Sequence, residues 1–541
     1  MTKQHAVKEE NHAERLAKEQ KSISVSQFFE RNRHLLGFDN PIKALSTTVK
    51  ELVDNSLDAC QDINILPEII VQIKKKSETN FVVIVEDNGP GIVKAQIPKV
   101  FAKLLYGSKF SKMRQSRGQQ GIGVSASVLY GQLTTGKASK ITSRISPKKP
   151  AQFVELHIDI NRNEPEILQE KEIEWLNKEH GTKVEIELEG KYQKGRLSVD
   201  EYIKQTAISN PHADITYLAP DEPAVKYKRA TTELPKEPME IKPHPYGVEL
   251  GVLLRMAKQT ASRTLQGFLS SDFSRVSPAV AKEICDKAGV SVDAKPQELM
   301  HQDVDKIFQA IKQVKIMSPP TNCLSPIGEE TLIKGLKKEL NAEFFAATTR
   351  PPTVYRGMPF QIECAIAYGG DLPADELVKV MRFANRVPLQ YMQSGCAITK
   401  SILGTAWKNY GISQSKGALP AAPMALVVHI ASVWVPFTSE SKEAIAHYPE
   451  IVKEIKLALQ ECGRKLFSFI RKTVHAREQQ ERANLFEKYI PELADALSDL
   501  TGDKKEAIEK DLQKILNKNM GSILKQTENG TEAKQERRIE Q

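Results

Sequence analysis

Cysteine is scarce in this sequence, and no two cysteines stand close together. None of the six among its 541 residues belongs to a Cys-x-x-Cys pair, which excludes a cysteine-ligated zinc knuckle. Scattered single thiols are typical of proteins from a reducing compartment. The cysteines are Cys60, Cys285, Cys323, Cys364, Cys396 and Cys462.

Long apolar runs are absent as well. The N-terminal stretch MTKQHAVKEENHAERLAKEQK is charged throughout and does not have the apolar core of a signal peptide. The most apolar segment, APMALVVHIASVWV, contains His429 and is shorter than the roughly 20 residues that a membrane-spanning helix needs. We therefore interpret this segment as a buried strand and expect a cytoplasmic protein without membrane contact.

Charge of neither sign dominates. The formal net charge is +9 and the pI about 8.9, a mild basic bias that permits contact with nucleic acid without requiring it. With 40% hydrophobic and 27% charged residues, the composition is ordinary for a globular protein. A length of 541 residues is too great for a single core and suggests about three domains.

The first part of the chain is expected to be an α+β sandwich. A helix is predicted from Pro41 to about Cys60, followed by a hairpin of strands at 68–76 and 81–87 with SETN as the turn. KASKITSRIS, AQFVELHIDI and TKVEIELEG are also expected to be strands. Together these elements predict one sheet with helices to one side.

Shifts in composition predict the domain boundaries. The stretch APDEPAVKYKRATTELPKEPMEIKPHP, rich in proline and charge, separates the first sheet from four helical patterns, and strands return after PPTNCLSP. No internal repeat is visible. The expected parts are an N-terminal arm (1–21), the sandwich domain (22–235), a helical domain (243–318), a second sheet-containing domain (320–470), a charged helical region (471–524) and a disordered tail (525–541).

The stretch KELVDNSLDAC at 50–60 carries polar residues at spacings of four and three. On a helix, Glu51, Asn55 and Asp58 point the same way, while the apolar residues between them face elsewhere. Taken alone, such a face is usually a solvated surface. Three further clusters along the chain make a functional interpretation stronger.

The second cluster is EDNGPGI, where a strand ends at Asp87 and where Gly89 and Gly91 let the chain turn sharply. A carboxylate at a strand end can accept a hydrogen bond from an exocyclic amine such as that of adenine. Asp-Asn-Gly-Pro is also good turn chemistry, so a simple turn is the alternative.

The third cluster places Gly118, Gly121 and Gly123 before a helix, where backbone N–H groups and the helix dipole favour an anion. A flexible loop would have the same composition.

The fourth cluster, HGTKVEI, puts the Thr182 hydroxyl at the start of a strand. GQLTTGKAS nearly matches a Walker A loop, but Ala138 stands where the magnesium-binding hydroxyl is needed, and we reject that match.

In this order, ExxxNxxDA, DxGxG, GxxGxG and GT resemble the Bergerat ATP-binding fold of gyrase, MutL repair proteins, a class of heat-shock chaperones and the histidine kinases. The resemblance implies ATP and Mg²⁺ as cofactors. Glu51 would be the general base that polarises the attacking water, Asn55 the Mg²⁺ ligand and Asp87 the residue that reads adenine. A histidine kinase needs no such base, so Glu51 argues against that branch.

The resemblance also implies which residues contact the nucleotide. Ser108 and Lys109, together with residues 117–124, would form a lid over the phosphates. The full set is Asn55, Asp58, Asp87, Gly89, Gly91, Ser108, Lys109, Arg117, Gly118, Gln119, Gln120, Gly121, Ile122, Gly123, Val124 and Thr182.

Longer stretches narrow the resemblance, which covers residues 22–470, to one branch. SVSQFFERNRHLLGFDNPIKALSTTVKELVDNSLDA is similar to the B subunits of type IIB DNA topoisomerases (topoisomerase VI). FSRVSPAVAKEICDKAGV is similar to their helix-two-turns-helix domain, which a βαββ-type transducer domain would follow. Basic residues of the helical domain could contact DNA phosphate, although a solvated face is the simpler interpretation of each. These are Arg255, Lys258, Arg263 and Lys282.

VWVPFTSESKEAI resembles the switch loop of the transducer domain in gyrase-type ATPases. By this match Lys442 would reach the nucleotide and contact its γ-phosphate. The alternative is a lysine in the first turn of a helix, because TSESKE is good N-cap chemistry. Lys400 and Lys408 are the other candidates for the switch.

The same resemblance implies a mechanism and partners. ATP binding would bring two chains together, with the N-terminal arm crossing to the second copy. The C-terminal helices would transmit the motion to an A subunit that holds the DNA-cleaving tyrosine. The A2B2 assembly would pass one double-stranded DNA segment through another and relax supercoils, which places the protein at the nucleoid.

This chain contains no Toprim-like acidic cluster or winged-helix nucleophile, so we expect it to hydrolyse ATP without cutting DNA. It is also expected to lack the extra C-terminal β-domain of some B subunits. The alternatives are a MutL-like DNA repair ATPase and an ATP-gated clamp without strand passage.

Overall fold

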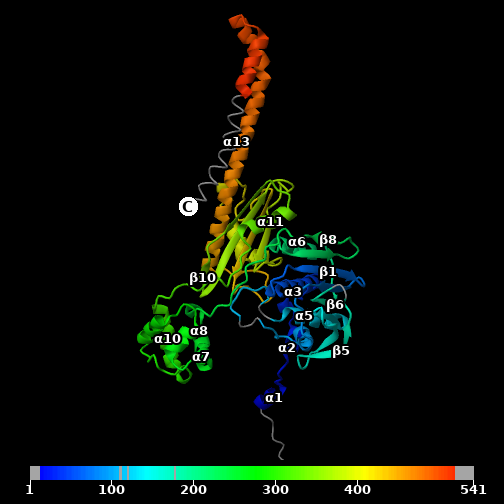
Figure 1. Ribbon diagram of the computed structural model, residues 1–541, viewed down its shortest axis with the longest axis vertical. Helices are drawn as coiled ribbons and strands as arrows, with labels where there is room; N and C mark the ends of the chain where they lie inside the picture. Colours follow the sequence, from blue (N-terminus) through cyan, green and yellow to red (C-terminus); the bar gives the residue numbers. More distant parts are fainter. Residues whose placement is uncertain (1–11, 109–111, 119–120, 176–177, 518–541) are drawn as a thin grey trace, which may run out of the picture. The chain divides into compact units, whose positions relative to one another are not determined.

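The computed structural model describes residues 12–108, 112–118, 121–175 and 178–517, coloured along the sequence in Figure 1. Contacts divide the chain into two compact units, one ending at Gly463 and the other beginning at Arg464. The first unit contains two sheets and a helical cluster. Within the described ranges, every helix is either too short or too polar to cross a bilayer.

The larger sheet has eight strands in the order β5-β4-β3-β6-β2-β1-β7-β8. Neighbouring strands are antiparallel except β1 and β7, which run parallel. The predicted hairpin of the first two strands is confirmed, with Val71 opposite Val85. The strands are β1 (Glu68–Lys75), β2 (Asn80–Glu86), β3 (Ser139–Arg144), β4 (Ala151–Asp159), β5 (Glu164–Ile173), β6 (Gly181–Glu189), β7 (Asp214–Leu218) and β8 (Val225–Tyr227).

One face of this sheet is apolar and carries the helices. In β6, the buried Val184, Ile186 and Leu188 alternate with half-exposed polar residues, as a sheet covered on one side requires. The helices of this domain are α2 (Val25–Arg31), α3 (Pro41–Asp62), α4 (Ile97–Ala102), α5 (Gly123–Thr135) and α6 (Val199–Ser209). The α+β class expected from the sequence is confirmed.

Helix α3 begins where the sequence predicts. Asn40 caps it by accepting a hydrogen bond from the N–H of Lys43 at 2.9 Å, and Pro41 occupies the first turn, where its missing N–H costs nothing. The helix buries most of its length in the core. It therefore holds the polar residues of KELVDNSLDAC at fixed positions relative to the sheet.

Three strands of the larger sheet have no strong local signal. β5 is half-exposed or exposed over its whole length and rich in charge, so it shows no apolar alternation. β7 and β8 are five and three residues long. Pairing with longer neighbours helps to make such short or polar segments strands.

Four helices form a cluster with a core of its own, and they lie between the two sheets in the sequence. Their apolar faces meet in a core that includes Leu253, Phe268, Ile284 and Ile307. The helices are α7 (Leu250–Gln259), α8 (Leu265–Asp272), α9 (Pro278–Ala288) and α10 (His301–Gln313).

The second sheet runs β10-β11-β14-β12-β13, and β9 pairs with β11. β14, the segment expected to be a buried strand, is buried at every position. It pairs in parallel with β12, and α12 lies in the crossover between them. The elements are α11 (Glu329–Glu339), β9 (Phe344–Thr349), β10 (Thr353–Tyr355), β11 (Met358–Tyr368), β12 (Lys379–Ala384), β13 (Val387–Pro388), α12 (Ala397–Leu403) and β14 (Met424–Ser432).

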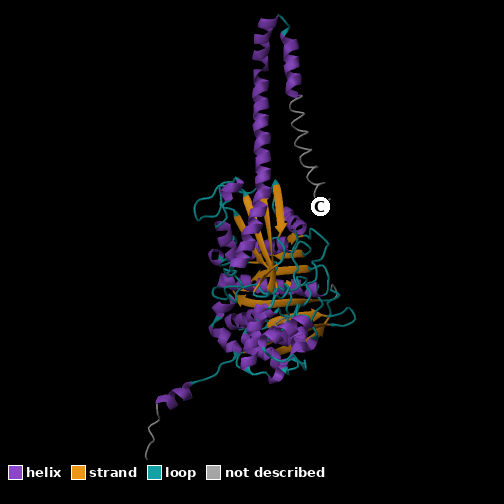
Figure 2. Ribbon diagram, turned by 90° about the vertical axis from the view of Figure 1, so that its left-hand side faces the viewer, coloured by secondary structure: helices purple, strands orange, loops and turns teal. Residues whose placement is uncertain are grey.

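The ends of the chain are helical where they are described. α1 (His12–Glu19) lies in the expected N-terminal arm, and α13 (Pro449–Thr501) is a single helix of 53 residues, whose later part stands clear as a long helical ribbon in Figure 2. The expected disordered tail lies outside the described residues. Short 3-10 helices occur at Arg33–Leu36, Lys94–Gln96, Pro245–Gly247, Pro296–Glu298, Gln393–Gly395 and Trp407–Tyr410.

Candidate functional site

An open cavity of about 520 Å³ lies between α3, the end of β2, the start of α5 and the loop at 440–442. Its volume is within the usual range of small-ligand sites, about 300–1,000 Å³. The sequence clusters meet here although they are far apart in the chain. The cavity wall includes Glu51, Asn55, Asp87, Gly91, Ser108, Gly118, Gly121, Ile122, Gly123, Val124, Thr182 and Lys442.

Glu51 reaches from α3 to the N-terminus of α5. A Cβ atom added to Gly123 would lie 1.8 Å from Glu51 Oε2, so the carboxylate rests against the bare backbone of that glycine. The position needs glycine because any side chain would displace the carboxylate. This contact holds the carboxylate at the cavity wall, beside the N-terminus of α5, where the helix dipole favours an anion.

Asn55 lies one turn after Glu51 on α3. Its side chain is exposed, whereas the other residues of the stretch 51–60, which the structure describes in full, are buried or half-buried. A Cβ on Gly118 would lie 3.8 Å from Asn55 Oδ1, so the amide oxygen faces the glycine segment across the cavity. Such an oxygen is a hard ligand that suits Mg²⁺.

A metal ion here would need ligands besides protein side chains. Among the residues that the structure describes, no three His, Cys, Asp or Glu side chains are grouped to hold one. Mg²⁺ commonly takes one or two protein ligands and completes its shell with phosphate oxygens and water. The side chains around Asn55 therefore fit a metal that enters with a phosphorylated ligand.

Asp87 lies in the cavity wall, just beyond the end of β2. Its Oδ1 accepts hydrogen bonds from the N–H groups of Gly89 (2.9 Å) and Thr182 (3.1 Å), and its Oδ2 accepts one from Ser56 (2.8 Å). A carboxylate has about four acceptor positions, so one is left for a ligand amine. Burial raises the pKa of Asp87 above its ordinary value, against the effect of these hydrogen bonds.

The glycines beside Asp87 allow a close backbone approach. Gly91 has φ +70°, and a Cβ there would lie 2.1 Å from the carbonyl oxygen of Arg144. Gly89 does not line the cavity but donates its N–H to Asp87. The sharp turn that the sequence predicts therefore brings the end of β2 against β3.

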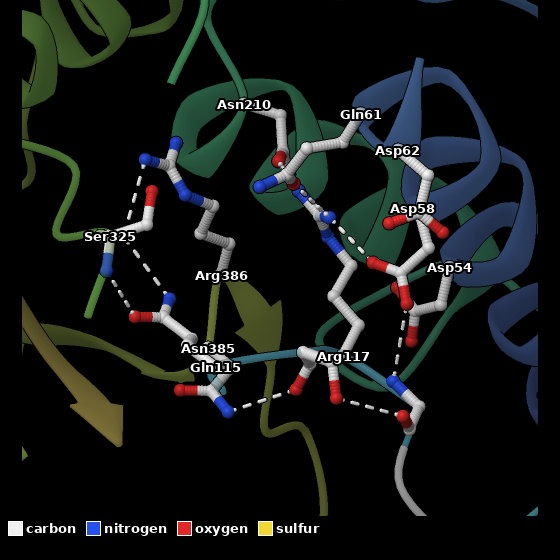
Figure 3. A network of polar contacts seen from close by, with 12 residues as sticks. Asp54, Asp58, Gln61, Asp62, Gln115, Arg117, Asn210, Ser325, Asn385 and Arg386 are labelled. Atoms are coloured by element: carbon white, nitrogen blue, oxygen red, sulfur yellow. Dashed lines mark hydrogen bonds and ion pairs between the residues drawn. The ribbon is translucent and has the colours of Figure 1, made fainter. Parts of the chain in front are cut away.

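The segment Gln115–Gly118, which leads into the third glycine cluster, is held by buried polar contacts (Figure 3). Arg117 donates to Asp58 (2.8 Å), Gln61 (2.9 Å) and Asn210 (2.6 Å). The carbonyl oxygen of Ser116 accepts a hydrogen bond from Asn385 at 2.9 Å. These contacts anchor one end of the expected lid.

Asp58 and Arg117 are therefore placed differently from what the sequence motif implies. Their side chains form a buried ion pair beside the cavity and do not belong to its wall. Burial explains the arrangement, because a carboxylate and a guanidinium withdrawn from water must pair with each other. Lys109, Gln119 and Gln120 lie outside the described residues.

Lys442 lies in the cavity wall, and its Nζ donates to the carbonyl oxygen of Arg117 at 3.4 Å. The alternative of a helix-start lysine is wrong, because Lys442 has φ +54° and the next helix begins only at Pro449. Lys400 and Lys408 are exposed and do not line the cavity. The four basic residues of the helical cluster, Arg255, Lys258, Arg263 and Lys282, are also exposed.

Some polar residues near the site are not indicated by any motif. Asn385 and Arg386 form a two-residue turn with φ of 48° and 70°, and Arg386 reaches the carbonyl oxygen of Pro326 at 2.9 Å. The N–H of Arg386 donates to His429 Nε2 (2.9 Å), while His429 Nδ1 pairs with Glu363 (2.7 Å). Burial lowers the pKa of His429, and its contacts fit a neutral ring. A polar residue inside an apolar strand is the signal that could have located this pair.

Two family models match the chain. Residues 43–182 match the model described as "Histidine kinase-, DNA gyrase B-, and HSP90-like ATPase", and residues 319–482 match "Topoisomerase VI B subunit, transducer". The first range contains most of the cavity wall, and the second contains the loop with Lys442.

Curated relatives match almost the whole chain. It is 50% identical to the B subunit of type 2 DNA topoisomerase 6 from Methanococcoides burtonii, over 95% of this chain and 82% of that protein. It is 46% identical to the protein of that name in Archaeoglobus fulgidus, over 93% of this chain and 83% of that protein. For Thermococcus gammatolerans the identity is 37%, over 92% of this chain and 95% of that protein.

Proposed function

This chain belongs to the family of type 2 DNA topoisomerase 6 B subunits, and on that premise we propose that its cavity hydrolyses ATP to drive DNA strand passage. The observation that carries the proposal is the convergence of Glu51, Asn55, Asp87 and Lys442 on one cavity. The resemblance of the first domain to gyrase-type ATPases supports ATP as the nucleotide.

Four residues of the cavity wall have a role in this proposal. Glu51 orients a water molecule toward the terminal phosphate and accepts its proton. Asn55 would hold Mg²⁺, which when bound would neutralise phosphate charge. Asp87 accepts a hydrogen bond from the adenine amine, and Lys442 contacts the γ-phosphate.

The glycine segments act on the phosphates. The backbone N–H groups at the start of α5 provide an anion site that needs no side chain. Ser108, Gly118 and residues 121–124, which all line the cavity, cover the phosphates. Asp58 and Arg117 position this lid by pairing behind it, rather than by touching the nucleotide.

Hydrolysis would be coupled to assembly. Two copies of this chain dimerise when ATP binds, and the second sheet, which carries the Lys442 loop, moves relative to the first. An A subunit provides the tyrosine that cleaves DNA, so that two A and two B subunits pass one duplex through another. The net charge of +9 favours contact with double-stranded DNA.

The alternatives are less well supported. A MutL-like repair ATPase or an ATP-gated clamp would not account for the match to a topoisomerase VI transducer over residues 319–482. The 50% identity to a type 2 DNA topoisomerase 6 B subunit, over 95% of the chain, also favours strand passage.

The test compares wild type with Glu51→Gln in steady-state ATP hydrolysis, in the presence of plasmid DNA and the A subunit. We expect Glu51→Gln to bind ATP but to hydrolyse it about 100-fold more slowly or worse, because a general base contributes about 10²–10⁴-fold. Equal hydrolysis by the two proteins would refute the assignment of the base. ATP-dependent relaxation of supercoiled plasmid and co-purification with the A subunit test the rest of the proposal.

A further inference from the structure

Lys43, in the first turn of α3, joins that helix to the loop that carries Lys442. Its Nζ lies 2.5 Å from Glu443 Oε1 and 3.0 Å from Asp39 Oδ1. The ring of Tyr391 lies 5.3 Å from the same ammonium. The residue next to Lys442 is therefore tied directly to the helix that carries Glu51.

The pair of Lys43 and Glu443 is largely withdrawn from water. The side chains are 12% and 9% exposed, so solvent screens their attraction much less than it does for a surface pair. Burial lowers the pKa of Lys43, but the hydrogen bonds to Glu443 and Asp39 outweigh it and leave the pKa raised. Lys43 is thus positively charged at any physiological pH.

The loop around Lys442 is a tight turn in which adjacent side chains have different partners. The N–H of Lys442 donates to the carbonyl oxygen of Ser439 at 3.1 Å, and Lys442 has φ +54°. Glu443 points to Lys43, whereas Lys442 reaches the carbonyl oxygen of Arg117. Holding Glu443 therefore sets the direction of Lys442.

The residue that holds the loop and the proposed base both belong to helix α3. Lys43 and Glu51 lie on α3, about 12 Å apart along its axis at 1.5 Å per residue. An anchor at Lys43 consequently places the loop, and with it the Lys442 ammonium, at a fixed distance from the proposed base. Without it, Lys442 would depend on a turn in a strained backbone conformation.

We propose that Lys43 and Glu443 are positioning residues of the ATPase: their ion pair holds the loop so that the Lys442 ammonium enters the cavity. The inference rests on the proposed function of Lys442. The alternative is an ordinary ion pair between two domains that contributes to stability alone.

A second ion pair provides a matched control. Lys379 on β12 lies 2.8 Å from Glu201 on α6 and likewise joins the second sheet to a helix of the first domain. Neither residue lines the cavity. Reversing the charge of Lys379 breaks a link between the same two domains without touching the Lys442 loop.

The experiment measures kcat and KM for ATP in the full chain, together with plasmid DNA and the A subunit. We expect Lys43→Glu and Glu443→Lys each to lower kcat about tenfold, because an interaction made in the transition state is lost. The double variant Lys43→Glu/Glu443→Lys should recover to within about threefold of wild type, since the pair is restored with opposite polarity. Lys379→Glu should leave kcat within about twofold.

The background of Lys442→Ala separates positioning from stability. If the pair acts through Lys442, adding Lys43→Glu to Lys442→Ala lowers kcat no further, whereas a purely structural pair would lower it by the same factor in both backgrounds. The inference would be overturned if the single charge reversals had the kcat of wild type. It would also be overturned if kcat of the double variant were lowered by the product of the two single-variant factors. These outcomes leave the test of Glu51 unaffected, so the two proposals can fail separately.

Discussion

At the scale of single residues, the contact between Gly123 and Glu51 governs the site. The carboxylate occupies the space that a side chain at position 123 would need, since a Cβ there would lie 1.8 Å from Oε2. The atom that would be displaced is the far end of a flexible side chain, so the fold can survive the substitution. The proposed hydrolysis cannot, because Glu51, the proposed base, must lie within hydrogen-bond reach of the attacking water.

Gly123→Ala is therefore expected to reduce ATP hydrolysis about 100-fold while the melting temperature changes little. Steady-state hydrolysis and thermal melting of the same preparation measure the two effects. Gly251→Ala is the control, because a Cβ on Gly251 meets nothing within 4 Å. Unchanged hydrolysis in Gly123→Ala would mean that Glu51 acts from another position.

His212 makes a pH-dependent contribution to stability. Burial and the charges of Arg386, Arg117 and Arg229 lower its pKa to about 2. The unfolded chain binds this proton below about pH 6.5 and the folded chain does not, so stability falls as the pH drops through that value.

We expect wild type to lose stability relative to His212→Gln by up to about 1.4 kcal/mol per unit below pH 6.5. Melting temperatures of the two proteins between pH 7.5 and 5 measure the difference. A gap that stays constant with pH would show that His212 can be protonated in the folded protein.

At the scale of elements, the segment Gln115–Gly118 links the first sheet to the second. Gln115 bonds Ser325 in both directions, with its Nε2 donating at 3.1 Å and its Oε1 accepting at 2.7 Å. Arg117 fixes the same segment to α3 through Asp58 (Figure 3). This end of the expected lid is therefore fixed both to Ser325 and to α3.

Arg117→Ala is expected to destabilise the domain strongly, by about 3–5 kcal/mol, because it breaks a buried ion pair by removing the guanidinium beside the Asp58 carboxylate. The double variant Asp58→Asn/Arg117→Gln should cost less than Arg117→Ala, since no charge is then left unpaired. Thermal melting provides the comparison. Arg114→Ala, which breaks a more exposed pair with Asp62, should cost at most about 1 kcal/mol, and an equal loss in Arg114→Ala and Arg117→Ala would contradict this account.

At the scale of the whole molecule, the chain separates an ATPase unit from a helical one. Residues up to Gly463 form the first unit, and the described part of the second is built on α13. The later part of α13 exposes a series of apolar side chains, and such exposed series are typical of protein–protein contact surfaces. They include Val474, Leu485, Tyr489, Leu493, Leu497 and Leu500.

A chain ending at residue 471 should keep ATP binding but lose co-purification with the A subunit. It keeps every residue of the first unit, which ends at Gly463, and removes the part of α13 with the exposed apolar side chains. The measurements are nucleotide binding and affinity capture of the A subunit, each made with the truncated and with the full-length chain. Equal capture with the truncated and full-length chains would place the A-subunit contact elsewhere.

Local patterns were enough to predict much of this molecule. The polar face of α3, the hairpin of β1 and β2, the glycines beside Asp87 and the buried strand β14 each depend on a few consecutive residues, whose periodicity and turn chemistry are readable directly. The convergence of these clusters on one cavity could be predicted because their order resembles a known family.

The partners of the charged residues could not be predicted in this way. Arg117 pairs with Asp58, 59 positions away in the sequence, and Lys442 donates to the carbonyl oxygen of Arg117, 325 positions away. Lys43 and Glu443, which form an ion pair, lie near opposite ends of the first unit in the sequence. A charge in a sequence carries no local sign of which distant charge will be buried beside it. The partners are determined only when the two sheets pack together, because packing removes water from these charges and a buried charge is stable only beside an opposite one.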